Sequence, residues 1–497
     1  MPIFSYQLQT NTVPHTVKCA RCLSISATPC LWLGLGVRWR NITAAYDMSG
    51  INIHQPINIH QPINVITPPT RESRCSARNE HWILSFLDML RHLLRRNAAF
   101  RALLCSRGLY AIAVHAIPVL LTITAISTGY DATAVGLILG VGALPAILGS
   151  ALTPIFLRWA SQRRLFMLLS MMWIGVSLFA GCWSLVSKLG LWQYMGISFL
   201  LEFASSVLTP ALQSYISQIV ETEELHSANA LFTAVMGTCS AVGPLLVAVL
   251  TLRPMPGALA WFALSAVMTA SVLMQRALPS GSPAAADSKD SMESKEYGVF
   301  KQLRDGWRYF IRLRPIVAVV AVSALWHITV WTLFMTEVPT MLSLDYRAVW
   351  AWGVLQSVFS VGSIVGSLIA LPSAWPLVAT CLLSLLPLCV LPLAMVMHAP
   401  LWVVFVLCGL GSLSIAASGI TWMTAIQRTV APHRIASVFA YDYMMSEGLA
   451  PLGYLVIPPL VAVMGTRPAI SGICIGMIGV LMVVSVGSSL PHFGGRS

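Results

Sequence analysis

The feature that most constrains the fold of this chain is a succession of long apolar segments between residues 104 and 490, separated only by short polar stretches. A helix rises about 1.5 Å per residue and the hydrocarbon core of a bilayer is about 30 Å thick, so about twenty apolar residues make one crossing. The sequence therefore predicts an all-α protein that crosses a membrane many times. Such a bundle leaves little chain outside the bilayer, which makes transport the first function to consider.

The composition excludes most soluble classes of protein. Hydrophobic residues make up 57% of the chain and charged residues 10%, and the mean hydropathy is +0.76. The net charge of +12 would indicate nucleic acid in a soluble domain, but anionic lipid headgroups account for it here, so we expect membrane lipids and no nucleic acid as partners. No phosphate-binding loop, His-Glu-x-x-His or Gly-x-Ser-x-Gly motif occurs, so we expect neither an enzyme nor a cofactor.

Apolar runs bounded by charges or by Pro and Gly predict twelve spans, six in each half of the chain. The first six spans cover residues 104–128, 132–157, 165–187, 191–220, 228–252 and 257–278. The second six cover residues 315–342, 349–371, 375–397, 401–426, 435–464 and 469–490.

Basic residues predict which side of the membrane each loop faces. If the N-terminus is cytoplasmic, the loops on that side hold clusters of arginine: Arg95, Arg96 and Arg101, then Arg158, Arg163 and Arg164, then the arginines between 276 and 314, and finally Arg428 and Arg434. The loops on the other side hold only Lys188, Arg253, Arg347 and Arg467. We therefore expect a multi-pass protein with both termini in the cytoplasm.

The spans and the segments between them predict five regions. Residues 1–80 contain a tandem hexapeptide and little helical periodicity, so we expect disorder, or a stretch before the true start of the protein at Met89. Residues 81–278 form the first six-helix half, 279–314 a cytoplasmic linker, 315–490 the second half and 491–497 a cytoplasmic tail. Within the linker, apolar and basic residues alternate at helical spacing, which predicts either an amphipathic helix or a plain lead-in to span seven.

The two halves of the chain also resemble each other in sequence. His226, Phe232 and Pro244 around span five match His433, Phe439 and Pro451 around span eleven at one constant offset. Repeats of this kind place the substrate site near the midplane, between the halves.

Cys19 and Cys22 form a single Cys-x-x-Cys pair without a second pair at ligand spacing, so we expect no metal.

Three segments resemble a known family. They are LRDGWRYF at residues 303–310, EELHSANAL at 223–231 and GLAPLG at 448–453. Across about residues 95–490 the chain is similar to the major facilitator superfamily, and in particular to its bacterial branch of enterobactin exporters and macrolide-efflux pumps. The resemblance implies two pseudo-symmetric six-helix halves that open alternately to either side of the bacterial inner membrane. It also implies proton influx in exchange for the export of a drug or siderophore.

The resemblance also implies roles in gating. The loop after span two keeps Gly149 and the basic residues Arg158, Arg163 and Arg164, but Leu157 stands where the family has an aspartate, so the charge brace of the gate is incomplete. In span five, Gly237, Gly243 and Pro244 match part of the motif that exporters carry. Gly448 and Pro451 are the corresponding breaks in span eleven. An ordinary kinked membrane helix would carry the same residues.

Ionisable side chains deep in the membrane are the candidates for function, because a charge at the bilayer centre costs at least about 2.5 kcal/mol. Glu202 lies about 15 Å along span four, and Asp442 and Glu447 about 12 and 20 Å beyond Arg434. Each could take up a proton from one side and release it to the other. The alternative is a carboxyl group that only hydrogen-bonds neighbours such as Ser446 or Tyr443 and stabilises packing.

Other polar and aromatic residues complete the set of candidates. His115 and His327 lie in the first helices of the two halves and could relay protons or serve as neutral packing residues. We expect Glu337 at the membrane interface and Arg107 extended toward the cytoplasmic headgroups. The aromatic residues expected to line the cavity, unless they form an interfacial belt, are Trp326, Trp331, Trp422 and Tyr443.

These observations predict a monomeric secondary active exporter of a small organic solute of the drug or siderophore class, driven by proton antiport. An importer or facilitator of the same fold is one alternative. A membrane-embedded assembly or sensor protein that transports nothing is the other.

Overall fold

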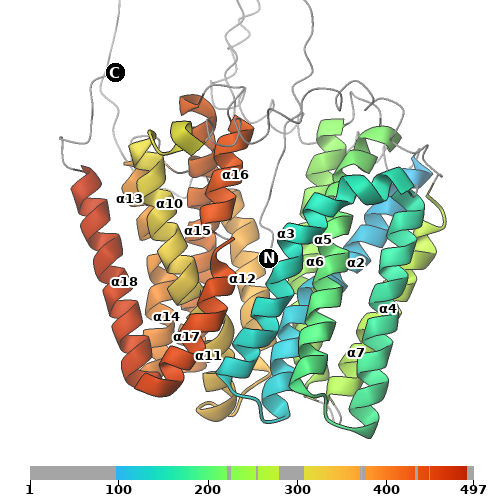
Figure 1. The fold of residues 1–497 in the computed structure, drawn as a ribbon, viewed down its shortest axis with the longest axis horizontal. Coiled ribbons are helices and arrows are strands. Elements are labelled where there is room, and N and C mark those ends of the chain that lie inside the picture. The colour runs from blue at the N-terminus through green and yellow to red at the C-terminus, as the bar shows by residue number, and fades with distance from the viewer. Residues whose placement is uncertain are drawn as a thin grey trace, which may run out of the picture. The chain divides into compact units, whose positions relative to one another are not determined.

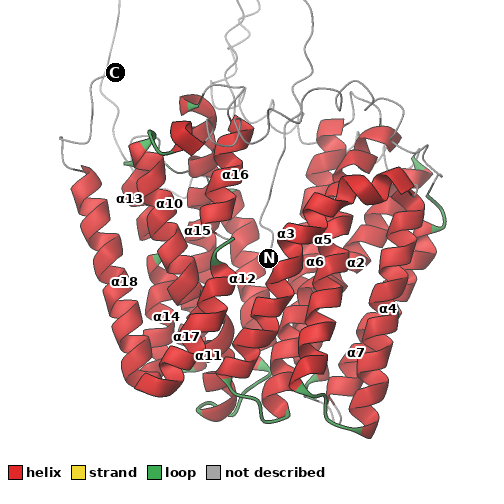
Figure 2. Ribbon diagram, viewed as in Figure 1, coloured by secondary structure: helices red, strands yellow, loops and turns green. Residues whose placement is uncertain are grey.

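The computed structural model describes residues 97–159, 162–220, 225–252, 256–278, 307–369, 371, 376–430, 435–446 and 448–489. All of these residues belong to one compact unit, in which helices are joined by short loops (Figure 2). The predicted N-terminal extension, most of the predicted linker, the C-terminal tail and Glu447 lie outside the described residues.

The first bundle contains the six helices predicted for the first half of the chain (Figure 1). They are α2 (Ala98–Ser127), α3 (Ala132–Trp159), α4 (Gln162–Val186), α5 (Leu191–Ile219), α6 (Leu225–Leu250) and α7 (Pro256–Gln275). Helix α2 begins six residues before the predicted start of span one, because the Asn97 side chain caps it by accepting a hydrogen bond from the Phe100 main-chain N–H at 2.8 Å.

The second bundle contains the other six spans, three of them interrupted. Span seven comprises α10 (Arg314–Trp326), the π-helix η2 (His327–Trp331) and α11 (Thr332–Leu344). Span eight is α12 (Ala351–Ser367), span nine is α13 (Leu377–Leu383) with α14 (Leu386–Val396), and span ten is α15 (Leu401–Thr429). Span eleven is α16 (Ile435–Ser446) with α17 (Ala450–Met464), and span twelve is α18 (Thr466–Ser489).

Length and hydropathy qualify nine helical stretches of the described chain as membrane spans when the interrupted helices are joined. Helices α3 and α12 add shorter apolar stretches, Ala132–Pro145 and Ala351–Ser367. Side chains such as Leu168, Val406, Val463 and Val483 are exposed, as expected of surfaces that face lipid, where apolar groups need no burial in protein. Multiple apolar helices thus identify a multi-pass membrane protein.

The helix contacts show that the two bundles repeat one arrangement. In the first bundle α2 packs against α6, α3 against α5 and α4 against α7. In the second bundle the corresponding pairs also pack: η2 and α11 against α17, α12 against α15, and α14 against α18. Between the bundles α6 packs against α12 and α3 against α17, which are spans five and eight and spans two and eleven. A pseudo-two-fold axis exchanges these two contacts.

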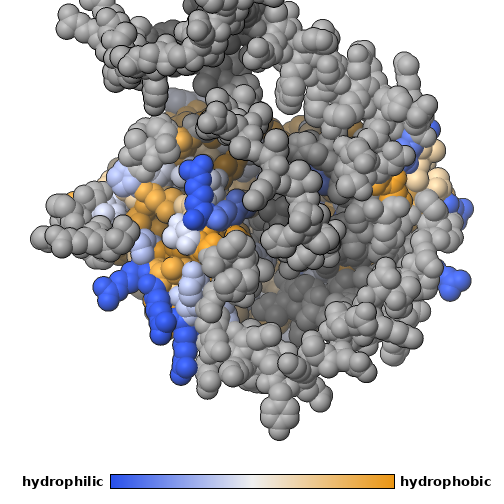
Figure 3. Space-filling view, turned by 90° about the horizontal axis from the view of Figure 1, so that it is seen from above, coloured by the Kyte–Doolittle hydropathy of each residue, from blue (hydrophilic) through white to orange (hydrophobic). Residues whose placement is uncertain are grey.

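The two ends of the bundles differ in charge. We call the end at which α2, α4 and α6 begin the basic end, because the exposed arginines Arg101, Arg164, Arg276, Arg308, Arg312, Arg314 and Arg428 lie there. The other end, the opposite end, exposes Lys188, Arg347 and Arg467. Figure 3 looks onto the basic end and shows hydrophilic side chains both at its margins and among apolar side chains.

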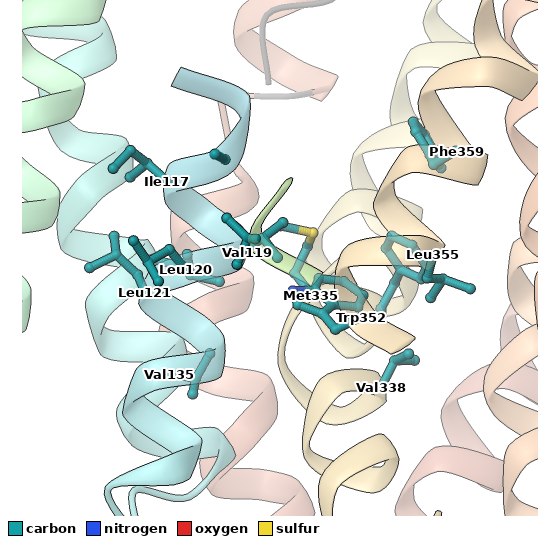
Figure 4. Close-up of a cluster of buried hydrophobic side chains, with 14 of the residues drawn as sticks. Ile117, Val119, Leu120, Leu121, Val135, Met335, Val338, Trp352, Leu355 and Phe359 are labelled. Carbon is teal, nitrogen blue, oxygen red and sulfur yellow. The ribbon is translucent and has the colours of Figure 1, made fainter. Parts of the chain in front are cut away.

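The two bundles share one hydrophobic core. In Figure 4, Val119 of α2 lies beside Met335 of α11 and Trp352 of α12, and these side chains are buried, with 1%, 6% and 0% exposed. All three positions belong to the half of their span that is nearer the opposite end. The core therefore joins the bundles at that end.

Candidate functional site

Asp442 is held by a hydrogen bond between two helices of the second bundle. The Trp422 indole Nε1 on α15 donates to Asp442 Oδ2 on α16 over 2.9 Å, and both side chains are half-buried. Ser446, considered from the sequence as a partner for the carboxyl group, instead donates to the Asp442 main-chain oxygen at 2.6 Å. Tyr443 is 47% exposed. The indole is thus the group that orients the Asp442 carboxylate.

A hydrophobic cluster of the second bundle packs against Trp422 on the side of the basic end. Trp307 stacks on Phe310 with ring centroids 5.7 Å apart and meets Tyr441, the neighbour of Asp442, edge-on at 5.6 Å. Phe310 and Tyr441 belong to the same cluster as Trp422. The last residues of the predicted linker therefore pack directly on the helix that carries Asp442.

The helix of span eleven is interrupted close to Asp442. Helix α16 ends at Ser446 and α17 begins at Ala450, and the Gly448 main-chain N–H donates to the Tyr443 main-chain oxygen at 3.0 Å. Pro451 lies in the first turn of α17, where its missing N–H leaves no helical hydrogen bond unmade. A break at this depth leaves main-chain groups free to rearrange, as in the interrupted helices of transporters.

His327 opens the π-helix in span seven. Its Nδ1 lies 2.8 Å from the Ser323 carbonyl oxygen. The Trp326 ring meets the His327 ring edge-on at 5.1 Å, and Trp331 packs on Phe334 at 5.4 Å. Trp326 is 2% exposed and belongs to the shared core, whereas Trp331 is half-buried. Segments of π-helix are frequent at functional sites.

The structure does not bring His327 and Asp442 to one depth. Helices α10 and α16 pack against each other. His327 lies thirteen residues from the start of α10, about 20 Å along the span, and Asp442 lies seven residues from the start of α16, about 10 Å along it. The two residues therefore lie on neighbouring helices about two turns apart.

In the first bundle, His115 repeats the geometry of His327. Its Nδ1 lies 2.8 Å from the Ala111 carbonyl oxygen, four residues earlier on α2. A carbonyl oxygen can only accept, so in both histidines Nδ1 carries the hydrogen and Nε2 is the nitrogen left for other partners. The matched pair is a second sign of the repeat between spans one and seven.

Arg107 and Tyr110 form a buried polar cluster with α5 that the sequence interpretation missed. Arg107 is 7% exposed, its Cζ lies 4.0 Å from the Tyr110 ring centroid, and its Nε has no hydrogen-bond partner among the described residues. Tyr110 in turn lies near Glu202 and Ser205 of α5. The expectation that Arg107 reaches the headgroups is wrong, because α2 continues for nine residues before it, about 14 Å, and its side chain is buried over the Tyr110 ring.

Glu202 and Arg107 thus both lie near Tyr110. Glu202 is half-buried, and a buried arginine without a carboxylate partner is rare because removing its charge from water is costly. The sequence held one signal for this cluster: Arg107 and Tyr110 are three residues apart and so share a helix face. Which span that face meets could not be read from the sequence.

The gating residues of α6 lie at close contacts with other helices. A Cβ at Gly243 would overlap the Ile112 carbonyl oxygen of α2, and a Cβ at Gly353 of α12 would overlap the Pro244 carbonyl oxygen. A Cβ at Gly237 would come within 3.2 Å of Ile364. These glycines let α6 approach helices of both bundles.

Pro451 matches Pro244 in the sequence repeat that relates span eleven to span five. A Cβ at Gly140 of α3 would lie 3.9 Å from the Pro451 carbonyl oxygen, so each proline faces a glycine of the other bundle. Of the other gating residues, Gly149 and Arg158 lie in the last part of α3 and Arg163 and Arg164 at the start of α4. Arg164 is exposed at the basic end. The side chains of Arg158 and Arg163 lie outside the described residues.

Comparison with known proteins agrees with this architecture. The family model of the Major Facilitator Superfamily matches residues 103–454. The crystal structure of the nucleoside transporter NupG is similar, with a TM-score of 0.57 and 12% identity over 79% of this chain and 98% of that one. A POT family transporter in complex with 5-aminolevulinic acid has a TM-score of 0.56 at 12% identity, covering 79% and 95% of the two chains.

A bacterial homolog of the human lysosomal transporter Spinster, in its inward-facing and occupied conformation, has a TM-score of 0.55 at 13% identity, covering 80% of this chain and 96% of that one. At these identities the similarity concerns the fold alone. The comparison with curated proteins finds no match.

Proposed function

The chain belongs to the major facilitator superfamily, and we propose that this membrane transporter exports a small organic solute in exchange for protons. Its fold is that of a transporter and not of an enzyme. The proposed location is a bacterial cytoplasmic membrane, with the basic end and both termini in the cytoplasm, and the proposed functional form is a monomer.

The observation that carries proton coupling is the Asp442 carboxyl group, which accepts one hydrogen bond from Trp422 and lies beside a broken helix. Ionisable groups within spans mark ion or substrate pathways because their burial is costly. In the proposed cycle Asp442 binds a proton at one side of the membrane and releases it at the other. Glu202 of span four is the candidate acid in the first bundle.

The contacts between the bundles support alternating access. Val119, Met335 and Trp352 join the bundles near the opposite end, so a site between the bundles would be closed there and reached from the basic end. Rocking of one bundle against the other would break these contacts and open the opposite end. With the basic end in the cytoplasm, solute would be taken up from the cytoplasm and released outside.

Export, rather than import, is supported by α6. Pro244, which with Gly243 matches the exporter motif, packs against Gly353 of α12 in the other bundle, at a contact that an exporter would have to keep sealed during turnover. The similar structures carry names of transporters for different solutes, and the fold therefore leaves the cargo open. Our proposal of a drug or siderophore rests on the resemblance to the enterobactin and macrolide exporters.

One proton is energetically sufficient for this export. A potential of about 100 mV contributes about 2.3 kcal/mol per charge, and one pH unit adds about 1.4 kcal/mol. Together they support an outward gradient of several hundredfold, at about 1.4 kcal/mol for each factor of ten.

Transport in inverted membrane vesicles tests the proposal. With the vesicle interior acidified, ethidium and a catecholate siderophore serve as probes of the two cargo classes, and vesicles with wild-type protein should accumulate one of them. The protonophore CCCP should abolish accumulation, as should the Asp442→Asn variant. Accumulation that ignores the proton gradient, or probe movement only in the direction of import, would contradict the proposal. A knockout screened for drug sensitivity and for secreted iron chelators identifies the cargo class independently.

A further inference from the structure

Glu337 of α11 lies buried where the two bundles meet. Its side chain is 3% exposed, and α11 packs against α2 and α3 of the first bundle. From the sequence we expected Glu337 at the membrane interface, but in the structure protein covers its side chain, because α11 also packs against α17. It is an acidic residue in the same contact region as Val119, Met335 and Trp352.

No described residue neutralises this carboxyl group. Its Oε1 is buried without a hydrogen-bond partner, and neither oxygen has an ion-pair partner among the described residues. The charged group that interacts with it is another acid, Asp131. Asp131 is exposed and precedes α3, where its Oδ1 accepts a hydrogen bond from the Ala134 main-chain N–H at 3.0 Å.

The other elements that pack against α11 carry few titratable groups. Helices α2, α3, α12, α14 and α17 and the π-helix η2 all contact α11. Apart from Asp131 and the groups near the basic ends of α2 and α3, their titratable side chains, with those of the loop after α11, are His115, His327, Cys389, Tyr454, Asp345, Tyr346 and Arg347. Of all these groups, Asp131 is the one that interacts electrostatically with the Glu337 carboxyl.

Burial and a neighbouring acid both disfavour the ionised form of the Glu337 carboxyl group. A carboxylate removed from water without a cation or hydrogen-bond donor is strongly disfavoured, and a second carboxylate nearby adds repulsion. The neutral form of Glu337 is therefore the one that a closed contact accommodates. If the bundles separate at this end, water reaches Glu337 and its ionised form becomes acceptable.

We propose that Glu337 binds a proton to hold the opposite end closed, with Asp131 across the contact between the bundles as the group that forces them apart when Glu337 is ionised. In the open form, Glu337 is a hydrated carboxylate. A proton from the solution at that end forms the O–H bond, the neutral side chain is buried, and the bundles close. Deprotonation to the same solution reverses these steps.

We call this closure by a protonated Glu337 the latch. It rests on the proposed function only for the step of the transport cycle in which it acts. If the opposite end faces the outside, protons from the outside would return the empty exporter to the form that accepts cytoplasmic solute. The proton would then be bound in the step that resets the transporter. The dependence of closure on pH, in contrast, requires no assumption about cargo or direction.

The distance between the bundles at the opposite end tests the latch. Spin labels at Lys188→Cys in the first bundle and Trp402→Cys in the second, both exposed, report that distance in the full chain in lipid nanodiscs, with the other reactive cysteines replaced by serine. In the wild-type background the ratio of closed to open forms should rise as pH falls from 8.5 to 5.5, by up to about tenfold per pH unit for one proton.

The variants decide whether Glu337 is the group that responds. Glu337→Gln, which is neutral at every pH, should remain closed throughout. Asp131→Asn should favour the closed form while keeping the response to pH. Asp345→Asn, which neutralises an exposed acid directly after α11, is the matched control and should keep the wild-type response. A wild-type ratio that does not change with pH, or a Glu337→Gln variant that still responds, would overturn the proposal.

Transport distinguishes failure of the latch from failure of the proposed function. Closure that ignores pH, together with proton-driven accumulation in inverted vesicles, contradicts the latch alone. Closure that follows pH without such accumulation contradicts the exporter and leaves the latch standing.

Discussion

Trp422 and Asp442 are joined by a hydrogen bond of 2.9 Å from the indole Nε1 to the carboxylate Oδ2, across the contact between spans ten and eleven. The bond fixes the direction of a carboxylate four residues before the end of α16. A hydrogen bond to a charged group contributes about 1.5 to 3 kcal/mol. Movement of the broken span eleven against α15 would break it, so proton binding at Asp442 is tied to the position of that span.

We expect Asp442→Asn to lose proton-driven transport, because an amide cannot bind and release the proton. Trp422→Phe keeps the ring but removes the donor, and should lower flux by about tenfold, the equivalent of about 1.4 kcal/mol in the barrier. The measurement is the initial rate of probe accumulation in inverted vesicles at fixed protein level. Equal rates in wild type and Asp442→Asn would show that this carboxyl group takes no part.

Replacing the buried Arg107 should affect stability and transport in opposite directions. Arg107→Met keeps much of the side-chain volume and removes a charge whose Nε has no partner, so the free energy of unfolding should rise by about 1 kcal/mol or more. Transport should fall, because the charge that is removed lies over Tyr110, which also neighbours the candidate proton site Glu202. Melting in detergent measures the first effect and vesicle uptake the second. A variant that is both less stable and fully active would contradict this interpretation.

The close approach of α6 and α2 predicts that Gly243 tolerates no side chain. In Gly243→Ala the new Cβ would overlap the Ile112 carbonyl oxygen, and relief of such overpacking costs about 1 to 3 kcal/mol. The matched control is Gly175→Ala in α4, where a Cβ meets nothing within 4 Å and alanine favours the helix by up to about 1 kcal/mol. Melting temperatures in detergent should fall for the first variant and hold or rise for the second.

The two histidines should not relay protons. A relay needs one ring nitrogen to accept a proton while the other releases one, but Nδ1 of His115 and of His327 is held by a main-chain carbonyl that cannot pass a proton on. We expect His115→Gln and His327→Gln to retain the pH dependence of transport. The measurement is flux between pH 6 and 8. A flat profile in either variant would assign that histidine to the proton path.

Most helices could be predicted from the sequence because their cause is local. A run of apolar residues long enough for the bilayer must form a helix, since nothing in lipid satisfies main-chain groups otherwise. The twelve predicted spans all coincide with helices of the described chain. The helix ends were less accurate, as at α2, because polar residues such as Arg101 continue a helix beyond its apolar part.

The interruptions were predictable only in part. Gly448 and Pro451 marked the break between α16 and α17, because glycine and proline weaken a helix through their own backbones. Nothing in the residues 327–331 predicts the π-helix η2. A Cβ at Gly453 of α17 would overlap the Ile328 carbonyl oxygen, so η2 lies against a neighbouring helix that no local pattern reveals.

By itself the sequence determined that this is a many-spanning membrane protein with a repeated half, because hydrophobic length, charge asymmetry and an internal match are properties of the chain alone. Only the tertiary structure decided which polar groups are buried and beside what. Arg107 and Glu337 were both expected at the membrane surface and are 7% and 3% exposed. The reason is that depth along a helix follows from counting residues, whereas the neighbour across a contact is set by how the helices pack.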